Sequence, residues 1–257
     1  GRTRRNLERA LRLKIIDEAS QDAARAVQDA DLVLLATPVG QMAAVMTEIA
    51  PHLPARAIVT DAGSTKRDVV DCGRRFLGSH YPRFVPGHPI AGTEKSGAAA
   101  AFPELYRGKT VILTPQSETR SSATRLVRQA WEACGARVTQ LDAREHDAIL
   151  AAVSHLPHVI AFALVNMLAG GRDPARLFGL SAGGLRDTVR IAGSSPEMWA
   201  DICSANRDAL LAVLEQYQNE LEEMRAAIES GNAAELVRRF ERARRAREKW
   251  LVGKHGR

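Results

Sequence analysis

Residues 31–38 read Asp-Leu-Val-Leu-Leu-Ala-Thr-Pro, a continuous apolar run that ends at Thr37-Pro38. Such a run is typical of a strand buried on both faces of a parallel sheet. We expect a helix with one apolar face to follow it and to stop at Pro51. Residues 57–61, Ala-Ile-Val-Thr-Asp, predict the next buried strand. Strands that alternate with helices in this way indicate an α/β fold.

The alternation continues to about residue 142. Short strands are expected at Phe84-Val85, 110–114 and 137–141, with a helix over 125–134, and Ser64 is placed to cap another helix. After residue 142 the strand signals disappear. We therefore predict a Rossmann-like, doubly wound dinucleotide-binding domain over residues 1–142 and an all-helical domain over residues 143–257.

The second half contains clear helix boundaries. Residues 144–167 have a helical period, with Pro157 as a kink or restart. Ser195-Pro196 is an N-cap with proline at the first helical position, and it predicts one long helix toward Ser230. Asn232 and Glu235 form a capping box that starts the last helix.

The N-terminal residues lack the most specific sequence motif of a nucleotide-binding domain. A doubly wound domain begins with a strand, a glycine-rich turn and a helix that receives the pyrophosphate, yet no G-x-G-x-x-G occurs in the first thirty residues. Residues 1–5, Gly-Arg-Thr-Arg-Arg, suit the end of the second strand. The first strand and glycine-rich loop, roughly 30 residues, are then expected upstream of Gly1.

The same residues bear on the choice of cofactor. NAD-specific folds place an acidic residue at the end of the second strand, whereas basic residues accept the 2′-phosphate of NADP. Here Arg2, Arg4 and Arg5 occur and no acid does. They predict NAD or NADP with a slight preference for NADP; alternatively, the arginines only solvate the start of a helix.

The formal net charge of +6 comes from the two ends of the chain. Residues 1–14 carry six Arg and Lys against one Glu, and residues 238–257 carry nine against two acidic residues, whereas the body is net acidic. Aromatic residues make up only 5% of the chain, so stacking platforms for nucleic acid are not favoured. We expect no nucleic-acid partner.

Cysteine usage and hydropathy bear on the compartment. The three cysteines form no C-x-x-C pair, which predicts neither a disulfide framework nor a metal site, and suits the cytoplasm. The longest apolar stretch, about 159–169, is short of the ~20 residues of a spanning helix, so no membrane segment is expected.

The most informative segment is residues 86–97, Pro-Gly-His-Pro-Ile-Ala-Gly-Thr-Glu-Lys-Ser-Gly. His88 lies between Gly87 and Pro89, which fixes its backbone and suits a positioned general base. The alternative is a structural histidine in a loop.

Two further patterns are compatible with a polar pocket. Asp147, Ala151, Ser154 and His158 recur at spacings of four, three and four, which places them on one helix face. That face either lines a pocket or is the solvent-exposed side of an amphipathic helix. His155, one residue off this face, is expected to point elsewhere, as a structural or interface residue.

Arg186 and Arg190, four residues apart, are either a surface cluster or a clamp for a carboxylate.

Five strings in this order carry a resemblance to a known family. They are Ala-Thr-Pro-Val at 36–39, Thr-Asp-Ala-Gly-Ser-Thr-Lys at 60–66, the histidine segment at 87–97, Val-Ser-His-Leu-Pro-His at 153–158, and Arg-Ile-Ala-Gly-Ser-Ser-Pro-Glu-Met-Trp at 190–199. Together they resemble the prephenate and arogenate dehydrogenases of tyrosine biosynthesis. The first two are shared with other β-hydroxyacid dehydrogenase-like reductases, whereas the histidine and Ser-His-Leu-Pro-His strings are specific.

The resemblance implies an oxidative decarboxylation in which hydride passes to NAD(P), a base removes the 4-hydroxyl proton and carbon dioxide leaves. It implies that His88 and Ser64 are catalytic and that Arg190, rather than Arg186, holds the ring carboxylate. The rest of the substrate pocket would consist of Thr93, Glu94, Asp147, Ser154, His158 and Trp199. The cofactor would contact Arg2, Thr3, Arg4, Thr37, Pro38, Val39 and Ser64.

The resemblance also implies that residues 143–257 are a substrate and dimerisation domain and that the protein is a homodimer through the C-terminal helices. Large apolar helix faces without a sheet of their own fit this expectation. The leading hypothesis is therefore an NAD(P)-dependent prephenate or arogenate dehydrogenase. Two alternatives stay open: a non-catalytic binding or assembly module without the phosphate loop, and another reductase of the 6-phosphogluconate and β-hydroxyacid dehydrogenase-like superfamily.

Overall fold

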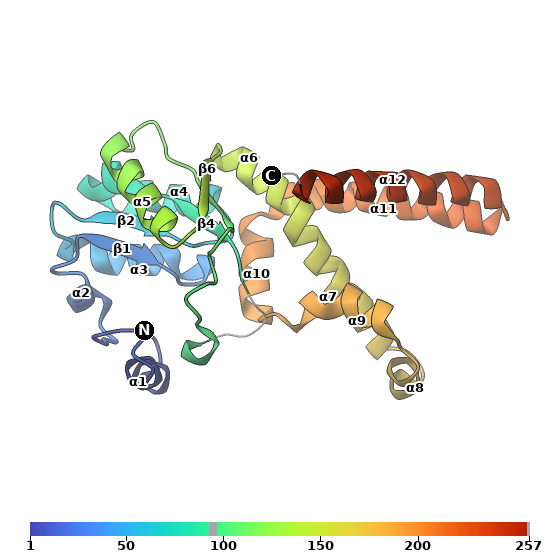
Figure 1. Ribbon diagram of the computed structural model, residues 1–257, viewed down its shortest axis with the longest axis horizontal. Coiled ribbons are helices and arrows are strands. Elements are labelled where there is room, and N and C mark those ends of the chain that lie inside the picture. The colour runs from blue at the N-terminus through green and yellow to red at the C-terminus, as the bar shows by residue number, and fades with distance from the viewer. Residues whose placement is uncertain (93–96, 256–257) are drawn as a thin grey trace. The chain divides into compact units, whose positions relative to one another are not determined.

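The computed structural model describes residues 1–92 and 97–255, with side chains to Val252. The chain forms two compact units, Gly1–Leu210 and Leu211–Arg257. The helices and strands of Figure 1 run, in chain order, as follows: α1 Arg4–Arg12, α2 Ala23–Ala26, β1 Leu32–Leu35, α3 Met42–Ile49, β2 Ile58–Asp61, α4 Arg67–Phe76, β3 Phe84–Val85, β4 Gly87–Ile90, β5 Thr110–Leu113, α5 Ser121–Ala133, β6 Arg137–Gln140, α6 Ala143–Leu150, a π-helical turn Ala151–His155, α7 Leu156–Ala169, α8 Pro174–Gly179, α9 Gly183–Val189, α10 Pro196–Ala205, α11 Arg207–Glu229 and α12 Ala233–His255.

The first sheet is parallel, with strand order β1-β2-β3. Strand β2 is buried along its whole length, as the apolar run predicts. Strand β1 differs, because Leu32 and Leu34 are 37% and 46% exposed, so the prediction that it is buried on both faces is wrong. Among the described residues, no element covers that face of β1. Helices α3 and α4 complete the core on the other face, around Met42, Met46, Val59 and Phe84.

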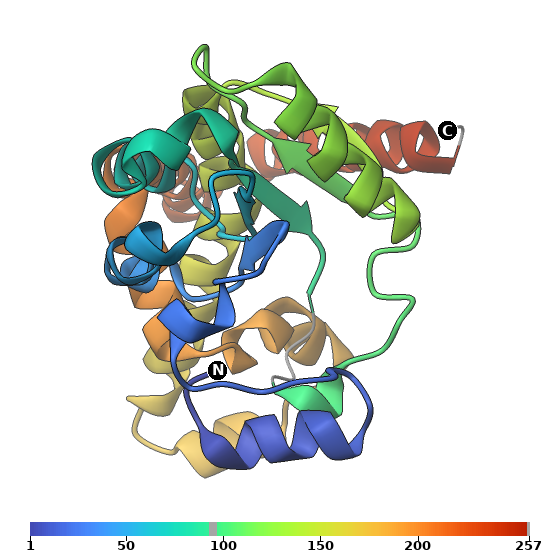
Figure 2. The ribbon, with the colours of Figure 1, turned by 90° about the vertical axis from the view of Figure 1, so that its left-hand side faces the viewer.

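The second sheet has the order β4-β5-β6, with β4 antiparallel to β5 and β5 parallel to β6. Helix α5 packs on it through Val127 and Trp131, and Figure 2 shows this helix lying along the strands. His88 lies within β4 and pairs with Ile112 of β5. The expected loop histidine is therefore held in a strand, which restricts its backbone further. The α/β fold class is confirmed.

The helical region starts at Asp142, whose carboxylate accepts hydrogen bonds from the N–H groups of Arg144 and Glu145. Ser195 caps α10 as predicted, by accepting from the N–H of Met198. The single long helix expected from Ser195 toward Ser230 is wrong, because Asn206 leaves helical geometry and separates α10 from α11. Its buried side chain bonds elsewhere, as described below. The predicted boundary at residue 142 stays a prediction.

The second unit is a helical hairpin of α11 and α12. Asn232 accepts from the N–H of Glu235, which confirms the predicted cap. Gly231, with φ of 65°, makes the turn in the left-handed region that glycine adopts without strain. Arg239 forms ion pairs with Glu220 and Glu223 across the two helices. Four further arginines pair with glutamates of the same hairpin, namely Arg238, Arg242, Arg244 and Arg245.

Residues Ala143–Ala169 form a continuous helical stretch of 27 residues, whose most apolar 18-residue window has a mean hydropathy of 2.0 and is long and apolar enough to cross a membrane. This exceeds the short apolar stretch expected from the sequence, because α6, the π turn and α7 are continuous. Only 22% of that window is buried within one copy of the chain. An apolar helix that is poorly buried requires cover from another surface.

Candidate active site

The candidate site is built around the ends of the parallel strands. Thr37 and Pro38 follow β1, and Gly63 and Ser64 follow β2. Ligands of open α/β sheets bind beyond the carboxyl ends of the strands, because the following loops and helix N-termini meet there. Strand β4 with His88 then starts from the same region, since the N–H of Gly87 donates to Asp61 at the end of β2 over 2.9 Å.

A fully buried ion pair between Asp61 and Lys66 fixes this region. The Lys66 ammonium binds the Asp61 carboxylate and donates to the carbonyl of Gly87 over 2.8 Å. Asp61 also accepts from the N–H of Gly63 over 2.7 Å. A buried ion pair is tolerated only when its remaining hydrogen-bonding capacity is used, as it is here. The pair thereby ties the loop after β2 to the residue that precedes His88.

Gly87 is required by this arrangement. A Cβ atom at this position would lie 3.0 Å from the carbonyl oxygen of Asp61 and 3.2 Å from Leu113. Neither neighbour has room to withdraw, since Asp61 and Leu113 are fully buried. The glycine of the Gly-His-Pro string therefore allows β4 to approach the end of β2.

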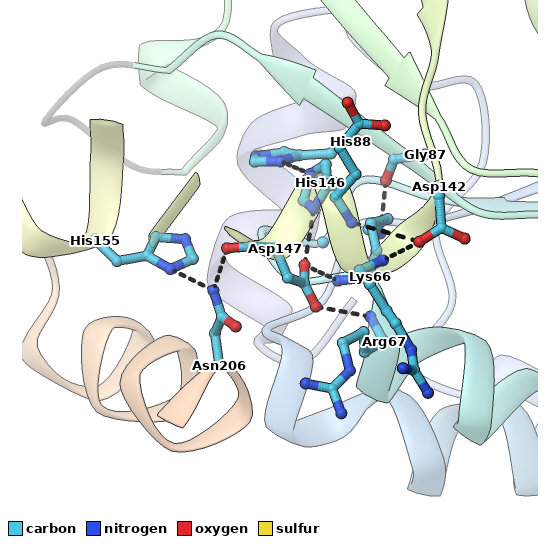
Figure 3. A network of polar contacts seen from close by, with 12 residues as sticks. Lys66, Arg67, Gly87, His88, Asp142, His146, Asp147, His155 and Asn206 are labelled. Carbon is cyan, nitrogen blue, oxygen red and sulfur yellow. Dashed lines mark hydrogen bonds and ion pairs between the residues drawn. The ribbon is translucent and has the colours of Figure 1, made fainter. Parts of the chain in front are cut away.

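His88 is the last member of a three-residue hydrogen-bonded chain (Figure 3). Its Nδ1 atom lies 2.9 Å from Nε2 of His146, and Nδ1 of His146 lies 2.7 Å from Oδ1 of Asp147. The Asp147 carboxylate is itself fixed, because it accepts from the backbone N–H groups of Lys66 and Arg67 over 2.8 and 2.9 Å. His146 and Asp147 are buried, whereas His88 lies partly open at the end of the chain.

The carboxylate end decides where the protons of this chain lie. Burial acts to raise the pKa of Asp147, but the hydrogen bonds from His146 and from the N–H groups of Arg67 and Lys66 hold it below its ordinary value. Asp147 is therefore an anion that only accepts, and His146 must donate from Nδ1. His146 then accepts at Nε2 from Nδ1–H of His88. This leaves Nε2 of His88 as an unprotonated acceptor.

The surroundings also keep His88 neutral. Burial lowers its pKa well below the ordinary value, and the positive charge of Lys66 acts in the same direction. At pH 7 the ring therefore has a free lone pair at Nε2. A neutral imidazole with a fixed tautomer is suited to accept a proton from a hydroxyl group.

Asp147, Ala151, Ser154 and His158 do not form the single helix face that their spacing predicts. The π-helical turn Ala151–His155 inserts one residue into the helix, which rotates the later side chains relative to Asp147. His155, expected to point elsewhere, is 1% exposed, and its Nδ1 atom lies 3.1 Å from Nδ2 of Asn206. The burial of His155 and its contact with Asn206 are compatible with the predicted structural histidine. Ser154 uses its carbonyl to accept from Nδ1 of His158 over 2.9 Å.

His158, Trp199 and Arg190 form a second group. The rings of His158 and Trp199 are stacked with centroids 3.6 Å apart. Burial lowers the pKa of His158, and the positive charge of Arg190 lowers it further. Arg190 therefore lies close enough to act on this ring. The structure thus brings Arg190 and Trp199 to His158, which precedes them in the sequence by 32 and 41 positions.

Not all predicted site residues can be placed. Thr93 and Glu94 lie outside the described residues. Ser64 is half-buried beside the ring of His155, whose pKa it affects through its backbone. Ser64 does not cap a helix as expected, because α4 begins only at Arg67 and its N-cap residue is Lys66. Its side chain is therefore not committed to a helix terminus.

The residues expected to hold a dinucleotide lie on the strand ends and on α1. Arg2, Thr3 and Arg4 stand at the N-terminus of α1, whose first turn holds no acidic residue. The side chain of Thr3 makes no capping bond, so its hydroxyl and the first N–H groups of the helix are available to an anion. Val39 is buried against Gly63, where a Cβ atom would lie 3.0 Å from it. The two strand-end loops thus approach each other closely, and the start of α1 offers unpaired N–H groups to an anion. Both features are compatible with a bound nucleotide.

His146, Lys66 and Asn206 were missed as functional candidates. Lys66 stood inside a quoted string and His146 next to Asp147, but neither has a local signal for its partners, which lie up to 81 residues away. The one available signal was a polar residue at a position expected to be buried.

The parallel sheet, the strand-end loops and the neutral histidine define a dinucleotide-dependent dehydrogenase with an attached helical domain. Residues 2–140 match the family model described as prephenate dehydrogenase, nucleotide-binding domain, and residues 142–242 match its dimerization domain. The chain belongs to the prephenate dehydrogenase family.

Curated relatives agree with this assignment. Cyclohexadienyl dehydrogenase of Zymomonas mobilis is 40% identical over 242 residues, which cover 93% of this chain and 82% of that protein. Prephenate dehydrogenase of Bacillus subtilis is 36% identical over 241 residues, which cover 93% of this chain and 65% of that protein. The second relative is thus about half as long again as the region it shares with this chain.

Solved structures are similar over nearly the whole chain. Prephenate dehydrogenase from Aquifex aeolicus, in complex with hydroxyphenyl propionate and NAD⁺, has a TM-score of 0.90 at 36% identity and covers 97% of this chain and 87% of that one. Synechocystis arogenate dehydrogenase has a TM-score of 0.78 at 29% identity and covers 97% and 89%.

Proposed function

We propose that this protein is an NAD(P)-dependent dehydrogenase that oxidatively decarboxylates prephenate, arogenate or both, giving 4-hydroxyphenylpyruvate or tyrosine. The observation that carries the proposal is the chain from Asp147 through His146 to His88, which ends on a neutral ring nitrogen at a dinucleotide-binding sheet. A non-catalytic binding module has no need of such a chain. Family membership favours the dehydrogenase over that alternative and over other reductases of the superfamily.

The proton step falls to His88. Its Nε2 atom accepts the proton of the substrate's 4-hydroxyl as the C4–O bond gains carbonyl character, before the ring becomes aromatic with loss of carbon dioxide. When NAD(P)⁺ is bound, it accepts the hydride that leaves C4. The positive charge that forms on His88 is stabilised through His146 by the Asp147 carboxylate. Because aromatisation makes the reaction strongly favourable, the site needs orientation more than a strong base.

The ring carboxylate of the substrate is assigned to Arg190. A guanidinium group matches a carboxylate with two parallel hydrogen bonds. Arg190 acts on His158, which stacks on Trp199, so the three side chains offer a cation beside a flat apolar surface. Such a surface suits a substrate ring. Thr93, Glu94 and Ser154 are proposed to complete the pocket, and Ser64 to act next to His88.

The cofactor preference is proposed to be NADP. Arg2 and Arg4 at the start of α1, without an acid in the first turn, favour a 2′-phosphate over a free ribose hydroxyl. Replacing both by Ala in the full-length protein should raise the KM for NADP by about 10–100-fold, the equivalent of one or two lost charge-assisted hydrogen bonds. The KM for NAD should change little. Arg9→Ala with Arg12→Ala, further along α1, is the matched control.

The chain is proposed to act as a homodimer through its helical region. The poorly buried apolar stretch Ala143–Ala169 and the match to a dimerization domain support this assignment. Val153 and Met167 are 68% and 64% exposed in one copy, so a second copy would remove a large apolar area from water. A cytoplasmic location stays a prediction from cysteine usage.

The function is tested by adding prephenate or arogenate to the full-length protein with NAD or NADP and following the absorbance of the reduced cofactor. We expect turnover with at least one of the four combinations. The ratio of kcat/KM values assigns the preferred substrate and cofactor. If no combination gives turnover while NAD(P) still binds, the proposal is wrong.

A further inference from the structure

The hydrogen-bonded chain from Asp147 through His146 to His88 is called the His88 relay below. Neither this relay nor the proposed substrate pocket gives a role to the buried His155. It lies in the π-helical turn and is 1% exposed. Its ring faces the edge of Trp199, with centroids 6.0 Å apart. π-helical turns are rare and are frequently found at functional sites, since the inserted residue costs stability unless it is used. The position of His155 within this turn therefore calls for an explanation.

Asn206 fixes the tautomer of this histidine. Its Nδ2 atom lies 2.7 Å from the carbonyl oxygen of Asp147 and 3.1 Å from Nδ1 of His155 (Figure 3). Because a carbonyl oxygen only accepts, the amide nitrogen of Asn206 must face it, and that nitrogen is a donor only. Nδ1 of His155 must then accept the second amide proton. The proton of the neutral imidazole is thereby placed on Nε2.

The resulting Nε2–H group is a buried donor. It has no hydrogen-bond partner among the residues that the structure describes. Leaving a buried donor unsatisfied is costly, so such atoms are usually completed in the working state of a protein. The ring lies beside the backbone of Ser64, which acts to raise the pKa of His155, as an acceptor does. The Ser64 carbonyl is therefore the acceptor to which we assign this proton, although in the free protein the bond is not closed.

We propose that His155 is a positioning residue that holds the Ser64 segment in its working geometry, through a hydrogen bond from Nε2–H to the Ser64 backbone, and that Asn206 sets this donor. The hydrogen bond closes fully when the site is loaded, since catalytic contacts are commonly long in the free enzyme and tighten with ligands. Asn206 contacts both His155 and the His88 relay. Its amide binds the backbone carbonyl of Asp147, and the carboxylate of Asp147 binds His146 in that relay.

A purely structural role makes the opposite demand on His155. If the ring serves only to accept from Asn206, then Nδ1 matters and Nε2 does not. The two nitrogens can be separated by substitution. An Asn side chain places its amide oxygen near the Nδ1 position and can still accept, whereas a Gln side chain places its amide nitrogen near the Nε2 position and can still donate.

The activity test, which rests on the proposed dehydrogenase function, compares His155→Asn with His155→Gln in the full-length protein. We expect His155→Asn to lower kcat by about 10–100-fold, the scale of a small misplacement of a reacting group, with KM changed much less. His155→Gln should keep most of the wild-type kcat. The same two substitutions at the exposed His52 are the control and should leave both constants unchanged.

Two results would overturn the proposal. One is full kcat in His155→Asn, and the other is an equal loss of kcat in both variants with a matching fall in melting temperature. Absence of turnover in the wild-type protein would instead count against the dehydrogenase function.

A measurement without substrate tests the tautomer directly. The ¹⁵N chemical shifts of the His155 ring should show Nε2–H near pH 7 in the wild-type protein, and a mixture of tautomers in Asn206→Ala. A wild-type ring protonated at Nδ1 would contradict the proposal whatever the activity data show.

Discussion

The Nδ1 atom of His88 lies 2.9 Å from the Nε2 atom of His146, and this contact joins a strand of the nucleotide-binding region to a buried carboxylate in the helical region. The order of donors along the chain is fixed by Asp147, which cannot donate. His88 therefore presents an unprotonated nitrogen without any need for a high pKa. Orientation and tautomer, rather than basicity, distinguish this histidine.

The role of His88 is tested by His88→Asn. The amide can keep a contact with His146 but cannot accept a proton at neutral pH, so kcat should fall by about 10²–10⁴-fold, the usual contribution of a general base. The substrate KM should stay nearly constant. Steady-state kinetics of His52→Asn, a substitution of the same kind at an exposed site, should match the wild type. A fall of less than about threefold at His88 would exclude it as the base.

Asp147 is expected to act through the tautomers of two histidines. Asp147→Asn can donate where the carboxylate accepts, which favours the wrong tautomer of His146 and hence of His88. Replacing the aspartate of an Asp-His pair in this way costs about 10⁴-fold in a well-studied protease, so we expect a loss of about 10²–10⁴-fold in kcat.

The matched control for Asp147→Asn is Asp142→Asn at the N-terminus of the same helix. Asn caps helices as well as Asp does, so its kcat and melting temperature should stay close to wild type. Equal kcat in the two variants would contradict the relay.

Arg190 and Arg186 are distinguished by substrate affinity. Arg190→Ala should raise the KM for the substrate by about 10–100-fold, because a charge-assisted pair is lost. Arg190→Lys should fall between, since a lysine keeps the charge but not the planar fork. Arg186→Ala, one helical turn earlier, should leave KM unchanged. A larger effect at Arg186 than at Arg190 would transfer the carboxylate to the other arginine.

Acid should destabilise the protein through its buried histidines. Burial lowers the pKa of His155 from 6.5 to about 4, and Asp147 opposes that shift without cancelling it. The unfolded chain therefore binds a proton between these values while the folded chain does not, so the free energy of unfolding falls as the pH falls through this window. For His155 alone the loss from pH 8 to pH 5 is about 2 kcal/mol.

Urea denaturation at both pH values measures this difference. The variant His155→Gln, which cannot titrate, should lose about 2 kcal/mol less than the wild type on acidification. His88 and His158, whose pKa values are also lowered, contribute in the same direction in both proteins. Equal losses in the wild type and the variant would show that His155 does not titrate in this range.

Much of the fold could be predicted from local patterns. The apolar runs before Thr37 and through Asp61 form parallel strands, and Ser195 and Asn232 cap the helices expected of them. These features depend on residues within one turn or one strand of each other. The long helix from Ser195 failed at Asn206 because a buried tertiary hydrogen bond outweighed a helical period that continues across the break.

The candidate site was predicted only in part, because many of its contacts join residues that are distant in the sequence. His88 stood out because its neighbours Gly87 and Pro89 restrict its backbone, and Asp147 stood out by its spacing. Their connection through His146 had no local signal, because it spans 58 residues. The π turn that brings His155 to Asn206 shifts the helix by one residue, which no regular period predicts.

By itself, the sequence determined the alternation of strands and helices, the helix caps and the identity of the candidate base, because these depend on local backbone preferences and apolar periods. Only the tertiary structure decided which nitrogen of His88 is free, which carboxylate holds its partner and where the proton of His155 lies. Proton positions follow from the donors and acceptors that meet in the buried interior, and those contacts form between segments that are distant in the chain.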